Sequence, residues 1–86
     1  MSRREEWRRV LQVELSRWSS MACNDVLVEL RNRDVYAVVS ESKQYQVEVE
    51  LLEDAPEYLH VGIAVDDGSL PASIRPESES FLCRKA

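Results

Sequence analysis

The sequence has few of the residues that form turns, disulfides or metal sites: its 86 residues include two glycines, three prolines, two cysteines and one histidine. All of the glycines and prolines except Pro56 lie within residues 62–76, so residues 1–67 carry no compositional sign of disorder. A single histidine excludes a multi-histidine metal site in one chain. No apolar run approaches the ~20 residues that cross a bilayer, so a membrane is not an expected partner.

The motifs of common catalytic and cofactor sites are missing. Cys23 and Cys83 match neither a zinc spacing nor a C-x-x-C motif, so we expect two reduced thiols in a cytosolic protein. The N-terminal residues lack the apolar segment of a secretory signal, which favours a cytoplasmic location. No phosphate-binding glycine loop and no G-x-S-x-G motif occurs. We therefore expect a protein that is not an enzyme and that uses no cofactor.

Charge is distributed unevenly along the chain. The net charge is −5, but residues 1–33 carry seven arginines against five acids, whereas residues 34–86 carry four basic residues against eleven acids. These two parts have net charges of +2 and −7, which could steer association with a charged partner or a second copy. Nucleic acid is an unlikely partner, because the concentrated basic positions are only Arg3, Arg4, Arg8 and Arg9.

The first third of the chain predicts helices. Apolar residues recur at three- and four-residue spacing over residues 3–21, the pattern of an amphipathic helix. Trp7 and Trp18 belong to this stripe and are expected in the core; the alternative is that one is half exposed and anchors a partner. Residues 26–31 fit a short helix capped by Asn24 and Asp25, although their β-branched valines favour a strand.

Alternation of apolar and polar residues predicts three strands, at residues 35–40, 44–52 and 58–65. The clearest is 44–52, where Tyr45, Val47 and Val49 share one face. Residues 53–57 would connect the second strand to the third. Residues 68–86 read as a coil-rich tail in which 80–84 could add an edge strand.

A five-residue connection fixes a predicted register between the second and third strands. The buried pairs would be Leu51–Leu59, Val49–Val61, Val47–Ile63 and Tyr45–Val65. The exposed pairs would be Glu50–His60, Glu48–Gly62 and Gln46–Ala64. Both faces stay consistent in this register, which is why we prefer it to a slip by one residue.

The exposed face of this predicted sheet holds the candidate site residues. Glu48, Glu50, His60 and Asp66 could together bind a metal ion or do acid–base chemistry, although a solvated surface explains them as well. Gly62 and Ala64 are small enough to admit another element against the sheet. Trp7, Trp18, Gly62 and Ala64 are thus the candidate interaction residues.

Together these patterns predict one α+β domain of two layers. Residues 1–33 form the helical part, 34–67 an antiparallel meander and 68–86 the tail. The expected core is Trp7, Leu11, Leu15, Trp18, Leu27, Leu30, Tyr45, Val47, Val49, Leu51, Leu59, Val61, Ile63 and Val65.

For function, we expect a non-catalytic interaction or regulatory module that binds an unidentified protein or forms a homodimer. The alternatives are a metal- or small-ligand-binding domain, and an acidic immunity or antitoxin-like protein that masks a basic partner.

Overall fold

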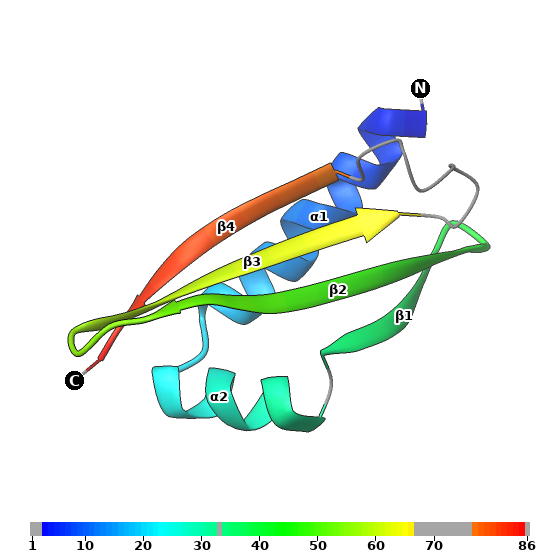
Figure 1. Cartoon of the computed structure of the whole chain (residues 1–86). Coiled ribbons are helices and arrows are strands. Elements are labelled where there is room, and N and C mark those ends of the chain that lie inside the picture. The colour runs from blue at the N-terminus through cyan, green and yellow to red at the C-terminus, as the bar shows by residue number, and fades with distance from the viewer. Residues whose placement is uncertain (1–2, 33, 67–76, 86) are drawn as a thin grey trace.

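The computed structural model describes residues 3–32, 34–66 and 77–85. Within these residues, two helices precede four strands, which confirms the predicted α+β fold. The elements are α1 (Arg3–Ser19), α2 (Cys23–Asn32), β1 (Val35–Ser40), β2 (Lys43–Asp54), β3 (Tyr58–Asp66) and β4 (Glu77–Arg84). The strands form one antiparallel meander in the order β1-β2-β3-β4. In Figure 1, α1 runs behind β3 and β4.

The ambiguous segment after residue 22 is a helix. The bond from the amide of Val26 to the carbonyl of Ala22 (3.0 Å) lies in its first turn. Asn24 and Asp25 therefore lie inside that turn rather than before it, which corrects the predicted cap. Helical spacing buries Cys23 and Val26 while Val28 faces solvent, a pattern that an alternating strand would not give.

Both helices close one face of the sheet around a single core. Its buried members are Trp7, Val10, Leu11, Trp18, Cys23, Val26, Tyr45, Val47, Val49, Leu59, Val61, Ile63 and Val65. Leu15, Leu27 and Leu30 pack against this core and are partly buried, whereas Leu51 is 36% exposed and was wrongly expected inside. Trp7 and Trp18 are each 1% exposed, so the alternative of a half-exposed tryptophan anchor is wrong.

The predicted register between β2 and β3 is wrong by two residues. Val49 lies opposite Ile63 and Glu50 lies opposite Gly62. The cause is that β2 continues to Asp54 and leaves only residues 55–57 as the turn, which shifts the pairs nearest the turn by three residues; the bulge between Leu51 and Glu53 then takes up one residue and reduces the shift to two. Because side chains alternate with a period of two, a two-residue shift keeps every earlier residue on its predicted face.

The C-terminal segment is more regular than expected. Glu77–Arg84 forms an eight-residue strand along β3, longer than the predicted edge strand at 80–84, and replaces coil in this part of the tail. Half-buried Phe81 lies opposite Val61, so this strand adds an apolar contact to the core face. Residues 68–76 and 86 of the predicted tail lie outside the described residues.

The two cysteines form a disulfide, which corrects the expectation of two reduced thiols. Cys23 begins α2 and Cys83 lies near the end of β4, with 5.7 Å between their Cα atoms and a sequence separation of 60. That proximity results from the sheet bringing β4 back beside the start of α2, which cysteine spacing alone does not reveal. The bond ties α2 to the strand at the edge of the sheet.

We predict that losing this disulfide lowers the free energy of unfolding by about 2–4 kcal/mol, because the bond closes a long loop in the unfolded chain. The measurement is urea unfolding of the oxidised protein with and without reductant, with the Cys23→Ser, Cys83→Ser double variant as control. The double variant should match the reduced protein and ignore the reductant. Equal unfolding midpoints for the oxidised and reduced wild type would contradict the prediction.

Candidate functional site

The face of the sheet opposite the helices, here called the outer face, carries the candidate site. Alternate residues of all four strands point to it, as the burial pattern of β2 and β3 shows. In the part of the chain that the structure describes, α1 and α2 pack only into the core on the other face. The outer face therefore presents polar and small residues, together with the exposed apolar side chains of Val35, Val39, Leu52 and Leu82.

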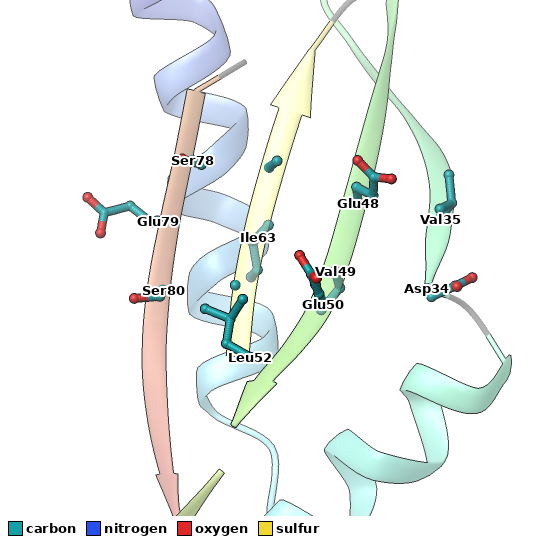
Figure 2. A pocket seen from close by; sticks show the side chains of 12 residues that line it. Asp34, Val35, Glu48, Val49, Glu50, Leu52, Ile63, Ser78, Glu79 and Ser80 are labelled. Atoms are coloured by element: carbon teal, nitrogen blue, oxygen red, sulfur yellow. The ribbon is translucent and has the colours of Figure 1, made fainter. Parts of the chain in front are cut away.

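A groove of about 720 Å³ crosses this face (Figure 2). We call it the outer groove; its lining residues come from the start of β1 and from the middle of β2, β3 and β4. They are Asp34, Val35, Glu48, Val49, Glu50, Leu52, Gly62, Ile63, Ala64, Ser78, Glu79 and Ser80. Four of these residues are acidic and none is basic. The groove is therefore a site of negative potential that favours a cationic group.

Small residues make the floor of the outer groove. Gly62 lies opposite Ser80 and Ala64 lies opposite Ser78, so two neighbouring strands carry short side chains side by side. Leu52 closes one end: a Cβ placed on Gly62 would lie 3.1 Å from Cδ1 of Leu52. Figure 2 shows the Leu52 side chain over β3, while Glu48 and Glu50 stand along β2. Alternation along β2 places Leu52 on the outer face with Glu48 and Glu50, and the bulge that follows sets Glu53 beside His60 on the same face.

Polar contacts hold the bulged end of β2. The Tyr58 hydroxyl donates a hydrogen bond to Oε1 of Glu53 (2.8 Å), and this bond, more than burial, raises the pKa of Tyr58. Lys85 Nζ lies 2.6 Å from Oδ1 of Asp54, and the Lys85 amide donates to the carbonyl of Glu57 (2.9 Å). These contacts join both strands of the hairpin to the end of β4 and so fix the position of Leu52.

The predicted acidic and imidazole groups are only partly brought together. Glu48 and Glu50 both line the outer groove, as the alternation predicts. His60, however, lies opposite Glu53, and its Nε2 is 3.0 Å from the Ser80 hydroxyl, so the predicted Glu50–His60 pair is wrong. Asp66 lies opposite Gln46 at the far end of β3. Among the described residues, no three histidine, cysteine, aspartate or glutamate side chains converge as a metal site would require.

The candidate interaction residues separate into two groups. Gly62 and Ala64 lie on the outer groove, whereas Trp7 and Trp18 are buried in the core on the other face. Sequence reasoning missed Leu52, Ser78 and Ser80 as lining residues. The alternation along β2 already places Leu52 on the outer face, although its contact with Gly62 needs the observed register, and the alternating Ser78 and Ser80 gave a weak strand signal that the expectation of a coil obscured.

One buried polar chain joins α1 to β1 on the core face. Nε1 of Trp18 donates to the Tyr36 hydroxyl (2.8 Å), which donates to Oε1 of Glu14, and Nη1 of Arg17 lies 3.5 Å from the same oxygen. Glu14 is 4% exposed, so its carboxylate depends on these donors. Burial, followed by the hydrogen bond to Glu14, raises the pKa of Tyr36 to about 12. Each side chain in this hydrogen-bonded network has a partner within it, which favours a structural role for the network over a catalytic one.

We predict that Tyr36→Phe lowers the free energy of unfolding at neutral pH by about 1–3 kcal/mol, because the Glu14 carboxylate and the Trp18 N–H each lose a buried partner. The raised pKa also has a consequence in alkali. Stabilisation from neutral Tyr36 is complete below its ordinary pKa of 10.0 and is lost as the pH rises through about 12.

Chemical unfolding of wild type and Tyr36→Phe across this alkaline range checks both statements. The wild type should lose more stability than Tyr36→Phe between pH 10.0 and about 12. Parallel alkaline profiles for these two proteins would show that Tyr36 has no such role.

Comparison with known proteins adds no relative: no family model, no curated protein and no solved structure matches the chain. Among the described residues, neither helix has the length and apolar character needed to cross a membrane.

Proposed function

We propose that the chain is a small, non-catalytic interaction module that binds a basic segment of a partner protein in the outer groove. The observation that carries the proposal is the groove itself: an acidic hollow with a floor of small residues, on the face that the helices leave open. The proposal includes self-association into a homodimer as a second mode of interaction.

Charge and shape both favour a cationic partner. Glu48 and Glu50 stand along one side of the groove, and Asp34 adds a third carboxylate at the start of β1. Glycine, alanine and serine on the floor leave room for the side chains of an inserted segment. Leu52, 49% exposed, offers an apolar contact beside the acids. Lysine or arginine flanked by apolar residues would satisfy both features.

The immunity or antitoxin-like alternative is one form of the same proposal, in which the basic partner is an enzyme or toxin whose cationic surface is masked. The metal- or small-ligand alternative has less support, because His60 faces Ser80 and Asp66 lies at the other end of β3. Within residues 3–32, 34–66 and 77–85 no cluster of possible metal ligands favours it, so the interaction module is the function proposed.

The test compares retention of proteins from a lysate of the producing cells by immobilised wild type and Glu50→Lys at physiological salt. Glu57→Lys is the control, since it makes the same charge change at an exposed turn outside the groove. We expect wild type and Glu57→Lys to retain the same basic protein, and Glu50→Lys to lose at least about tenfold of it, in a salt-sensitive way. Equal retention by Glu50→Lys would refute the proposed site.

We also propose a cytoplasmic location, as the sequence suggests. In that compartment thioredoxin and glutathione would hold Cys23 and Cys83 reduced, so the disulfide would belong to the oxidised form of the protein. Rapid alkylation of thiols in intact producing cells checks this and should modify both cysteines. Full protection of both from the alkylating reagent would contradict a cytoplasmic location.

A further inference from the structure

The free edge of β1 lacks the features by which natural proteins protect an edge strand. Among the described strands β1 pairs only with β2, and residues 35–39 contain no charge, proline or glycine. Its valines are exposed, Val35 by 46% and Val39 by 75%. Proteins normally blunt such edges with lysine, proline or a bulge, because an apolar edge readily pairs with another strand.

The pairing with β2 identifies the backbone groups that face this edge. The Val49 amide donates to the Asp34 carbonyl (2.7 Å), and the register places these two residues opposite each other. Hydrogen-bonded and non-hydrogen-bonded pairs alternate along an antiparallel ladder, so Tyr36 and Val38 also direct their backbone groups at β2. Val35, Ala37 and Val39 consequently direct their N–H and C=O groups away from the sheet.

We propose that two copies of the chain join along their β1 edges, antiparallel, about a two-fold axis at Ala37. Ala37 would then lie opposite Ala37 of the second copy, and Val35 opposite Val39. Each of these pairs exchanges two backbone hydrogen bonds, which gives about six across the interface. This edge is the surface for the self-association that the proposed function includes. The dimer rests on that part of the proposed function and does not depend on partner binding in the outer groove.

The distribution of charge around the β1 edge favours a second copy of the chain as the partner at that edge. No charged residue lies within the paired segments, and Asp34 would lie opposite Ser40 of the second copy, whose neighbour across its own hairpin is Lys43. The two Glu48 residues would be three strands apart and offset by four residues, roughly 20 Å. That distance exceeds the Debye length of about 8 Å at physiological salt, so the acidic grooves would not drive the copies apart.

The test introduces a charge at the proposed two-fold axis. Ala37 is exposed, so Ala37→Lys and Ala37→Glu each place an acceptable surface residue on the folded chain. Within a dimer, however, either would set two like charges directly opposite each other. Light scattering across a concentration series should give twice the 9.9 kDa chain mass for wild type. Each variant should show a dissociation constant raised about tenfold or more.

An equimolar mixture of Ala37→Lys and Ala37→Glu should recover the dimer, because unlike charges then face each other. Val13→Lys, which alters a 60% exposed valine on α1, is the matched control and should remain dimeric. A monomeric wild type, or dimeric single variants at Ala37, would overturn the inference.

Retention of the basic partner by monomeric Ala37→Lys keeps this test separate from that of the outer groove. If the wild type binds the basic partner but is a monomer, only the edge pairing is refuted. If the wild type forms the dimer but does not bind the basic partner, only the outer groove is refuted as the binding site.

Discussion

The period of two along β2 and β3 is the constraint on which the rest of the molecule depends. Tyr45, Val47 and Val49 are buried on one side of β2, whereas Glu48 and Glu50 are exposed on the other. A sheet with one apolar face needs one covering layer, which α1 and α2 provide. The acidic outer face needs no second covering layer, and it is the surface at which we propose that a partner binds.

The bulge at the end of β2 turns this plain surface into a shaped one. It places Leu52 on Gly62, sets Glu53 opposite His60 and brings the lysine after β4 to Asp54. The disulfide acts on the opposite face, where it joins α2 to β4. The bulge determines where the outer groove ends, and the disulfide holds the edge strand β4 against α2.

Prediction from sequence succeeded where a pattern is local and repeated. The alternation from Tyr45 to Glu50 assigned each residue to the correct face even though the register was wrong by two, since an even shift preserves the faces. The bulge, the disulfide and the Glu14–Tyr36–Trp18 chain escaped prediction because each depends on residues that meet only in the folded chain. Glu14 and Tyr36, for instance, are 22 positions apart. Helical spacing from Leu11 and Trp18 does place position 14 on the buried face, but the sequence does not show which residue would meet the Glu14 carboxylate there.

The central claim is that the outer groove is the binding surface, and chemical-shift mapping by NMR tests it most directly. Isotope-labelled protein would be titrated with a lysine-rich amphipathic peptide at physiological salt. The account predicts that the largest backbone shifts occur at Glu50, Gly62 and Ser80, while those of α1 stay in place. Shifts concentrated on the helices, or no shifts at all, would contradict it.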